Sequence, residues 1–212
     1  MELQNERKVY QSNELMEAHV GNNPFPLFTQ WFDAFRALQT DDATAMTLAT
    51  AGQKGPSARI VLLKNYSTEG FEFFTQYTSI KGQDIDKDPR VSLLFFWREL
   101  ERQVSIQGTA VRLTEQENDE YFYSRPIESQ AGAMASHQSH PVASREALLD
   151  SYTNLLEGCI ERGRGIRPAS WGGYRIVPTA FEFWQGRPGR LHDRLYYTLS
   201  EDNTWSFIRL AP

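Results

Sequence analysis

Strand-like segments that follow one another closely constrain the fold of this chain more than any other feature. Between residues 45 and 113, runs rich in β-branched and aromatic residues alternate with turns that contain Gly, Pro or Asp. A single short helix, at 79–86, is expected among them. Short connections without long intervening helices indicate an antiparallel sheet or barrel. The strands predicted in this part of the chain are 46–50, 57–66, 71–75, 91–97 and 103–113.

Helices are predicted on both sides of this strand-rich part. Asn23 and Pro24 fit the N-cap and first position of a helix, and the aromatic residues that follow at spacings of three and four form its core-facing stripe. A capping box that starts at Thr114 begins a second helix, and Ser144 caps a third. Residues 125–143 are expected to be loop with at most one short helix. The last strands are predicted at 171–177, 181–184, 191–199 and 205–210.

Composition limits the kinds of protein to be considered. The 212 residues carry a formal net charge of −5, which disfavours a nucleic-acid-binding protein because such a protein presents a basic face. The single cysteine, Cys159, excludes an intrachain disulfide framework and a thiolate metal cluster. No apolar run reaches membrane-spanning length, and the first residues lack the apolar core of a secretory signal. We expect a cytoplasmic protein with one domain, at 24–212, preceded by a flexible N-terminal arm, at 1–23.

Several motifs of nucleotide binding and catalysis are absent from the sequence. It has no G-x-G-x-x-G after a strand, no Walker loop and no G-x-S-x-G elbow. His137 and His140 stand three residues apart, but no carboxylate or thiol lies at ligand spacing from them, so no metal site is expected. A phosphate ligand would therefore have to be held by side-chain cations and hydroxyls.

The stretch 183–194 combines aromatic, cationic and turn-forming residues. Its Gly- and Pro-rich centre reads as a loop between two strands, which can direct Arg190, His192 and Arg194 toward one anion. A surface hairpin with solvated arginines is the alternative. Further cations on or beside strands could complete two phosphate pockets, or could be paired with carboxylates or exposed: Arg59, Lys64, Lys81 and Arg125.

A series of short motifs, in order along the chain, carries a family resemblance. They are R-I-V-L-L-K at 59–64, L-E-R-Q at 100–103, Y-F-Y-S-R-P at 121–126, S-Q at 129–130, G-A at 132–133, Q-S at 138–139, W-G-G at 171–173, F-W-Q-G at 183–186, R-L-H-D-R at 190–194 and R-L-A-P at 209–212. From about residue 24 to the end, the chain resembles the pyridoxine (pyridoxamine) 5′-phosphate oxidase family. The resemblance implies a mainly β fold with α additions, namely an antiparallel Greek-key split β-barrel flanked by helices, which binds FMN at the subunit interface of a homodimer.

The resemblance also implies roles for individual residues. Arg59 and Lys81 would hold the FMN phosphate. The rest of the cofactor site would comprise Ile60, Val61, Leu62, Lys64, Phe74, Thr75, Gln103, Gln138, Ser139, Trp184 and Arg194. The substrate phosphate would be bound by Lys64, Tyr121, Arg125 and Ser129. Arg190 and His192 would lie against the pyridine ring of the substrate as the catalytic pair.

The implied reaction is the FMN-dependent oxidation of pyridoxamine or pyridoxine 5′-phosphate to pyridoxal 5′-phosphate, with O2 as acceptor and H2O2 as product. A related flavin oxidase of phenazine biosynthesis and a non-catalytic flavin- or pyridoxal-phosphate-binding protein are the alternatives. The chain departs from the family pattern at three positions. Ile80 replaces a common basic residue, Met134 a common tryptophan, and Phe74 a frequent tyrosine.

Overall fold

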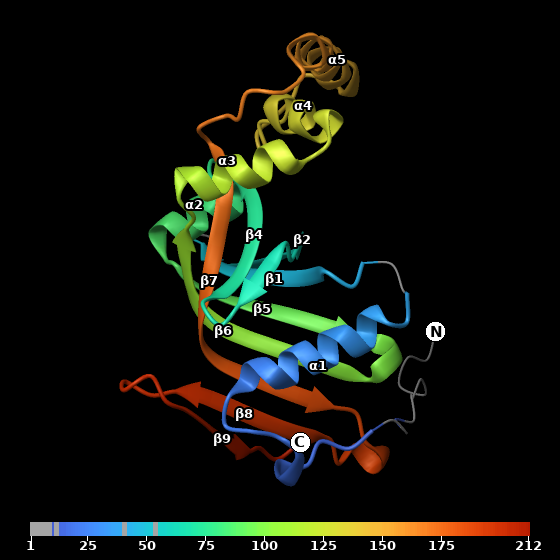
Figure 1. Cartoon of the computed structure of the whole chain (residues 1–212), viewed down its shortest axis with the longest axis vertical. Coiled ribbons are helices and arrows are strands. Elements are labelled where there is room, and N and C mark those ends of the chain that lie inside the picture. The colour runs from blue at the N-terminus through green and yellow to red at the C-terminus, as the bar shows by residue number, and fades with distance from the viewer. Residues whose placement is uncertain (1–9, 11–12, 40–41, 53–54) are drawn as a thin grey trace.

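A single antiparallel sheet forms the body of the protein, in a computed structural model that describes residues 10, 13–39, 42–52 and 55–212 (Figure 1). Within these residues nine strands follow the order β2-β1-β5-β6-β7-β4-β3, and β8 and β9 continue from β7. Every pairing is antiparallel, as predicted. The strands are β1 (Ala45–Gly52), β2 (Gly55–Leu62), β3 (Asn65–Ser67), β4 (Gly70–Gln76), β5 (Arg90–Trp97), β6 (Arg102–Arg112), β7 (Trp171–Gln185), β8 (Asp193–Leu199) and β9 (Trp205–Arg209).

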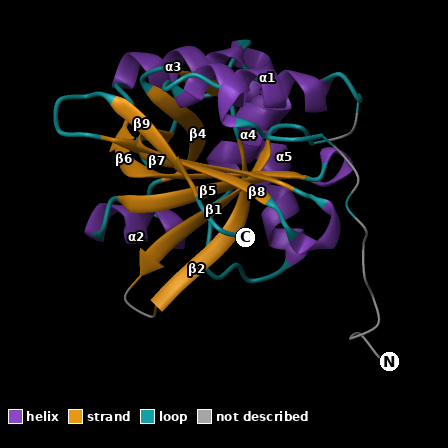
Figure 2. Ribbon diagram, turned by 90° about the horizontal axis from the view of Figure 1, so that it is seen from below, coloured by secondary structure: helices purple, strands orange, loops and turns teal. Residues whose placement is uncertain are grey.

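Helices lie on both sides of the strands and at one end of the molecule. They are α1 (Pro24–Arg36), α2 (Ile80–Lys87), α3 (Glu115–Ser124), α4 (Ile127–Ala135) and α5 (Arg145–Arg162). Viewed from below, α1 and α2 lie on opposite sides of the strands (Figure 2). The predicted caps are present, since the side chain of Asn23 accepts a hydrogen bond from Phe25 N and Thr114 forms the complete capping box. No helix among the described residues combines the length and the apolarity that crossing a membrane requires.

The core forms between α1 and the inner face of the sheet. The ring of Phe28 is fully buried and lies 4.9 Å from Phe71 and 5.3 Å from Phe95, measured between ring centroids. Trp31 meets Phe183 of β7 edge to face at 5.3 Å. Each such aromatic pair adds about 0.5–1.5 kcal/mol beyond the area that it buries. The aromatic stripe predicted for this helix therefore packs as predicted.

The outer face of the sheet is different, because large apolar side chains there are exposed. Residues alternate along β5, so that Phe95 is buried while its neighbour Phe96 is 57% exposed. On β2, Ile60 is 63% exposed and Leu62 is 40% exposed. In the single chain, no helix covers these three side chains.

Two segments differ from the prediction made from the sequence. The strand expected at 57–66 is interrupted, because β2 ends where it leaves β1, and the chain then turns so that Lys64 N donates to Glu72 O. The two strands expected at 171–177 and 181–184 form one strand, β7. Pro178 fits within β7 because the pairing with β6 shifts register between Gln107 and Gly108, which leaves Thr179 as the extra residue of a bulge where the missing N–H is tolerated.

The segment 125–143, expected to be loop with at most one short helix, contains the nine-residue helix α4.

The N-terminal arm predicted at 1–23 is described only in part, because residues 1–9 and 11–12 lie outside the described residues. The part from residue 13 onward packs against the last two strands. Leu15 is 3% exposed, and its N–H donates to Asp193 Oδ2 at 3.1 Å. The side chain of Glu17 is paired with Arg209 of β9.

Candidate functional site

Lys81 is a buried cation at the start of α2, close to the end of β4. Its side chain is 9% exposed. The ammonium Nζ donates to Gln138 Oε1 at 2.9 Å, to Thr75 Oγ1 at 3.2 Å and to Ser79 Oγ at 3.4 Å. Burial lowers the pKa of Lys81, and the positive charge of Arg59 lowers it further. All three of these acceptors are neutral, so the ammonium has the surroundings of an anion-binding group.

Arg59 of β2 adds a second cation to this place. Its Nη1 donates to Thr50 Oγ1 at 2.8 Å and its Nη2 to Ser57 Oγ at 2.5 Å. Burial lowers the pKa of Arg59, opposed by the negative charge of Asp84, whose Oδ2 lies 3.9 Å from Nη2. Arg59 thus lies near one carboxylate, whereas Lys81 donates to neutral oxygens among the described residues, and the surplus positive charge suits a phosphate.

An aromatic stack lies next to these cations. The ring of Phe74 is stacked on Tyr121, with centroids 3.9 Å apart, and on Trp171, with centroids 5.4 Å apart. Arg125 covers the other side, with its guanidinium carbon 5.0 Å from the centroid of the Trp171 ring. Phe74 and Trp171 lie on β4 and β7, whereas Tyr121 lies on α3, which stands with α4 beyond the end of the sheet (Figure 1).

The guanidinium of Arg125 is incompletely satisfied. Its Nη2 donates to the backbone oxygen of Ser129 at 2.8 Å, but its Nη1 is buried and has no hydrogen-bond partner among the described residues. Burial lowers the pKa of Arg125, although an arginine stays charged at any physiological pH. A buried cationic donor without a partner costs about 1–3 kcal/mol or more. The atom is therefore suited to receive an anionic ligand.

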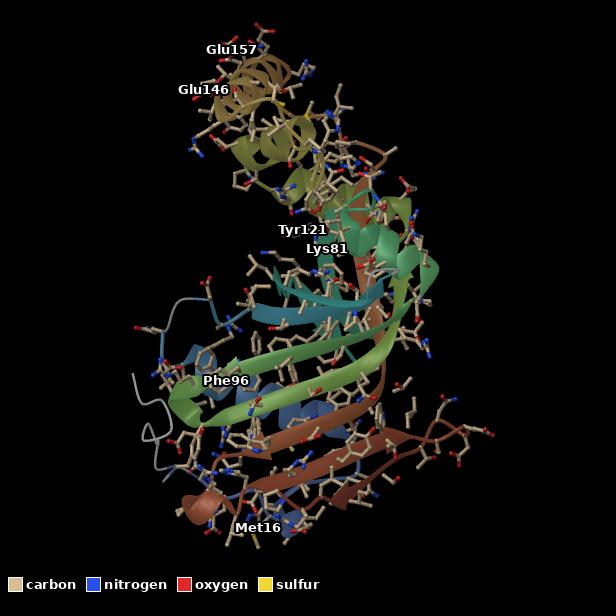
Figure 3. The ribbon with its side chains drawn as sticks, turned by 180° about the vertical axis from the view of Figure 1, so that it is seen from behind. Met16, Lys81, Phe96, Tyr121, Glu146 and Glu157 are labelled. Atoms are coloured by element: carbon tan, nitrogen blue, oxygen red, sulfur yellow. The ribbon has the colours of Figure 1, made fainter. Side chains whose placement is uncertain are left out.

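One cavity of about 330 Å³ connects Arg125 to the region around Lys81. Its lining includes Arg125 and Ser129 on one side and Thr75 and Gln138 on the other. Figure 3 shows Lys81 and Tyr121 close together at this end of the molecule. We call this group the cavity cluster, and its members are Arg59, Phe74, Thr75, Lys81, Tyr121, Arg125, Ser129 and Gln138.

A second group of predicted site residues lies on the outer face of the sheet and in the loop after β7. Gln103 of β6 pairs with Trp184 of β7, and Trp184 pairs with Arg194 of β8. Paired residues point to the same face, so these side chains form one row. The centroid of the His192 ring lies 4.6 Å from that of Trp184. We call this group the loop cluster, and its members are Gln103, Trp184, Arg190, His192 and Arg194.

The backbone of the loop has an unusual conformation at Arg190. This residue has φ of +64° directly after Gly189, which has φ of +67°. A non-glycine residue in the left-handed region costs on the order of 1–2 kcal/mol, and such strain gathers at functional sites. The side chain of Arg190 is exposed as a result and is available to a ligand.

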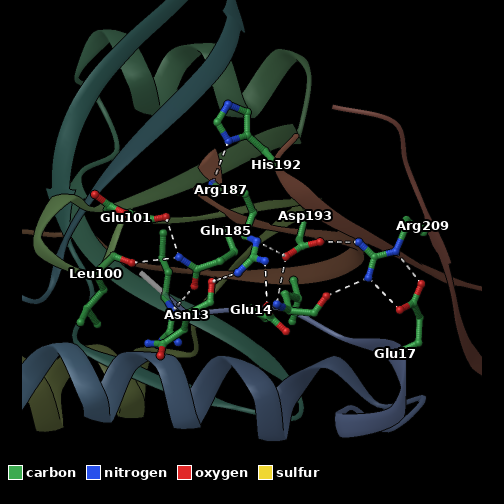
Figure 4. Close-up of polar contacts among 12 residues, drawn as sticks. Asn13, Glu14, Glu17, Leu100, Glu101, Gln185, Arg187, His192, Asp193 and Arg209 are labelled. Carbon is green, nitrogen blue, oxygen red and sulfur yellow. Dashed lines mark hydrogen bonds and ion pairs between the residues drawn. The ribbon is translucent and has the colours of Figure 1, made fainter. Parts of the chain in front are cut away.

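His192 is held in one tautomer. Its Nδ1 accepts a hydrogen bond from the backbone N–H of Arg187 at 3.1 Å (Figure 4), so the neutral ring carries its proton on Nε2. Burial lowers the pKa of His192, and the charge of Arg190 lowers it further, while Asp193 opposes both. At neutral pH the ring is thus an uncharged donor through Nε2.

A frame of ion pairs joins this loop to the N-terminal segment and to β9 (Figure 4). Asp193 lies 2.7 Å from Arg209 Nη1 and 3.6 Å from Arg187 Nε, measured from its two carboxylate oxygens. Glu14 pairs with Arg187 at 2.8 Å, and Glu17 pairs with Arg209 at 2.5 Å. The N-terminal segment therefore helps to fix the loop that carries Arg190 and His192.

The cavity cluster and the loop cluster lie at opposite ends of β7. Thr75 pairs with Gly172 at the start of this strand, and Gln103 pairs with Trp184 near its end. At a rise of about 3.3 Å per residue, these positions are separated by roughly 40 Å of strand. A flavin mononucleotide is much shorter, so a single chain does not bring the two clusters to one cofactor.

The remaining predicted site residues are exposed, except for Val61, which is half-buried. Lys64 is exposed, and its side chain makes no hydrogen bond or ion pair with another described residue. Ile60 and Leu62 are exposed on the outer face, whereas Val61 is half-buried on the opposite face. Ser139 is exposed and has φ of +69°.

Sequence reasoning missed four residues that surround Arg59 and Lys81, namely Thr50, Ser57, Ser79 and Asp84. Ser57 had a detectable signal, because it lies two residues before Arg59 on the same face of one strand. Asp84 had none, since only the packing of α2 against β1 brings it to Thr50.

Comparisons with known proteins give the same family over the whole chain. A family model described as pyridoxamine 5′-phosphate oxidase matches residues 32–156, and one described as the pyridoxine 5′-phosphate oxidase C-terminal dimerisation region matches residues 171–212. A pyridoxine/pyridoxamine 5′-phosphate oxidase of Trichormus variabilis is 47% identical, with 97% of this chain and 96% of that protein covered. One of Bordetella petrii is 47% identical over the full length of both.

Solved structures confirm the predicted split barrel. PhzG from Burkholderia lata, solved with tetrahydrophenazine-1-carboxylic acid, has a TM-score of 0.86 and 33% identity, covering 95% of this chain and 99% of PhzG. A pyridoxamine 5′-phosphate oxidase-related, FMN-binding protein from Nostoc punctiforme has a TM-score of 0.71 and covers 92% of this chain and 99% of its own. At 14% identity it shares the fold only.

The charge of Arg190 should be detectable in the titration of His192. In the wild-type protein we expect the NMR midpoint of His192 to lie below 6.5. Arg190→Ala should raise it part of the way back, because burial, the larger cause, remains. Arg190→Lys, which keeps the charge, is the matched control and should leave the midpoint low. An unchanged midpoint in Arg190→Ala would show that the two side chains do not interact.

Proposed function

This chain belongs to the pyridoxamine 5′-phosphate oxidase family, and we propose that it is a cytoplasmic enzyme that oxidises pyridoxamine and pyridoxine 5′-phosphate to pyridoxal 5′-phosphate. FMN, when bound, accepts the two electrons and passes them to O2, which becomes H2O2. The amine substrate also takes up water and releases ammonia. The observation that carries the proposal is that one cavity is lined by Arg125, whose buried Nη1 has no partner among the described residues, and by Thr75 and Gln138, which accept hydrogen bonds from the buried Lys81.

The residues around Lys81 fit the phosphate of FMN. Lys81 and Arg59 supply positive charge, and the hydroxyls of Thr75 and Ser57 already lie within hydrogen-bond distance of these cations. A phosphate can accept from all four groups, and charge-assisted bonds of this kind are about twice as strong as neutral ones. The cofactor would bring negative charge to a place that holds two cations and one carboxylate.

The residues around Arg125 fit the phosphate of the substrate. Arg125 Nη1 is a buried donor without a partner, and the backbone oxygen of Ser129 fixes the opposite side of the guanidinium. Tyr121 supplies a hydroxyl and, through its stack on Phe74, an apolar wall. Lys64, which is exposed and has a long side chain, is the fourth member of the proposed set.

Arg190 and His192 would orient the substrate ring. Arg190 carries a permanent charge on a strained, exposed turn and can donate to the phenolate-like oxygen of the pyridine. His192 donates through Nε2 without adding a second charge. Holding the ring in this way places C4′ beside the flavin and makes the transfer effectively unimolecular.

We propose that the enzyme is an isologous homodimer in which each FMN site takes the cavity cluster from one chain and the loop cluster from its partner. The separation of the two clusters along β7 supports this arrangement, as does the family model of a dimerisation region at 171–212. The exposed outer face of the sheet, with Ile60 and Phe96, offers apolar surface to a second copy.

A second candidate function is an oxidation of the phenazine type. PhzG, at 33% identity and a TM-score of 0.86, supports it. Tetrahydrophenazine-1-carboxylic acid is a planar anion, and Arg125 could receive its carboxylate as well as a phosphate. The two candidates therefore differ in whether turnover depends on a phosphate group.

Aerobic turnover of pyridoxamine 5′-phosphate should give pyridoxal 5′-phosphate and H2O2 in equal amounts, whereas unphosphorylated pyridoxamine should react poorly. Arg125→Ala should raise the KM for the phosphorylated substrate by about 10- to 100-fold, since a charge-assisted hydrogen bond contributes about 1.5–3 kcal/mol. Arg164→Ala, which removes an arginine that lies over Tyr123, is the control. Equal turnover with and without the phosphate, or turnover of a dihydrophenazine substrate alone, would overturn the proposal.

A shared site should allow two impaired variants to complement each other when activity is measured at a substrate concentration well below the wild-type KM. Arg125→Ala alters the cavity cluster and Arg190→Ala the loop cluster, so a mixed dimer contains one site with both changes and one intact site. Equal amounts of the two chains, unfolded and refolded together, should recover about a quarter of the wild-type activity, because roughly half of the dimers are mixed. Chains refolded separately are the control, and an absence of recovery would place both clusters in one chain's site.

Ile80 stands where the family commonly has a basic residue, and this replacement should lower the affinity for FMN. Ile80 is 57% exposed and directly precedes Lys81. Ile80→Arg would add a third cation and should tighten FMN binding by roughly tenfold, by a charge-assisted hydrogen bond, and the gain should shrink in high salt. Titration of the apo-protein by flavin fluorescence at two ionic strengths measures this, with Ile80→Gln as the uncharged control. An unchanged affinity would mean that backbone N–H groups at the start of α2 already satisfy the phosphate.

A further inference from the structure

Arg194 is held by two groups that have no role in the function proposed above. Its Nε donates to Glu182 Oε1 at 2.8 Å, and its Nη1 donates to the backbone oxygen of Ala211 at 2.9 Å. Its Nη2 has no hydrogen-bond partner among the described residues. Contacts within the chain thus hold Nε and Nη1, and Nη2 remains available to a ligand.

Glu182 reaches Arg194 because of the strand register. Trp184 pairs with Arg194, and Glu182 lies two residues before Trp184 on the same face of β7. Both side chains are half-buried, with 25% of Glu182 and 29% of Arg194 exposed. A solvent-accessible ion pair contributes little to the stability of a fold. The position of this pair beside Trp184 therefore says more about its role than its contribution to stability does.

The C-terminal tail supplies the second group. After β9 ends, the N–H of Leu210 donates to the backbone oxygen of Arg194 at 2.9 Å. This bond holds the tail beside β8 and places the oxygen of Ala211 at Nη1 of the same arginine. The R-L-A-P motif at 209–212 thus supplies the backbone groups that hold Arg194.

We propose that Glu182 and the carbonyl of Ala211 are positioning groups that hold the Arg194 guanidinium ready for the flavin. The inference rests on the proposed function, in which Arg194 belongs to the cofactor site. A free arginine loses rotamer entropy when a ligand fixes it. Here two contacts within the chain fix it before the flavin binds, which removes part of that cost.

Flavin titrations of apo-protein variants test the proposal. Glu182→Ala should weaken FMN binding by about five- to tenfold, through lost preorganisation, and Glu182→Gln, which keeps an acceptor, should weaken it less. Leu210→Pro removes the N–H that holds the tail and should also weaken binding. The matched controls are Pro212→Ala and Asp88→Ala, of which the second breaks the pair with Arg90 at 2.6 Å. Both should bind FMN normally.

The double variants separate positioning from general stability. If Glu182 and the tail act through Arg194, neither Glu182→Ala nor Leu210→Pro should weaken FMN binding further in an Arg194→Ala background. Equal losses in both backgrounds would overturn the proposal, as would normal affinity in the single variants. Thermal unfolding and sedimentation check that every variant is folded and keeps the wild-type assembly. If Arg194→Ala itself binds FMN normally, the assignment of Arg194 in the proposed function fails instead.

Discussion

The length of β7 is the constraint on which the rest of the structure depends. This strand runs from Trp171 to Gln185. It pairs with β6 along most of its length, with β4 at its start and with β8 at its end. A bulge at Thr179 lets it continue past Pro178. Two shorter strands could have folded back and brought both ends of the barrel together. One long strand keeps them apart, and this separation supports the proposal that a partner chain completes each site.

The pattern of charge pairing distinguishes the scaffold from the site. Arg209 and Arg187 meet carboxylates of Asp193, Glu17 and Glu14, and these pairs fix the N-terminal segment. Lys81 and Arg125 are more deeply buried, and their hydrogen-bond acceptors are neutral hydroxyl, amide or backbone oxygens. A fold that had only to be stable would gain from carboxylates at such places, because a buried charge without a counter-ion is costly. Their absence around these two described residues is the physical reason to expect anionic ligands.

Much of the fold was predictable from local patterns, and the site only in pieces. Alternating apolar residues gave β5 and β6, and caps at Asn23, Thr114 and Ser144 gave three helix starts. The continuity of β7 was not predictable, because Pro178 reads as a break unless the neighbouring bulge at Thr179 is known. One short helix was expected within 125–143, but the bounds of α4 were not predictable because its small residues carry little apolar periodicity. Arg190, His192 and Arg194 were grouped by their closeness in sequence, and their common role stays a prediction; their distance from Arg125 depends on pairing between distant strands.

The loop cluster contains His192, whose charge depends on pH, and ion pairs with the N-terminal segment support the loop that carries it. The hydrogen bond from Arg209 lowers the pKa of Glu17 to about 2, so this carboxylate stays charged unless the medium is strongly acidic. Its contribution to stability is present above its ordinary pKa of 4.5 and is lost only as the pH falls toward 2. His192 has its pKa lowered below 6.5, so its neutral form is favoured by folding and it gains a proton as the pH falls below that value. In mildly acidic solution the Glu17–Arg209 pair therefore persists while His192 becomes charged beside Arg190. The two cations then repel each other. If they hold the substrate ring as proposed, substrate binding should weaken at a pH where this ion pair still fixes the N-terminal segment.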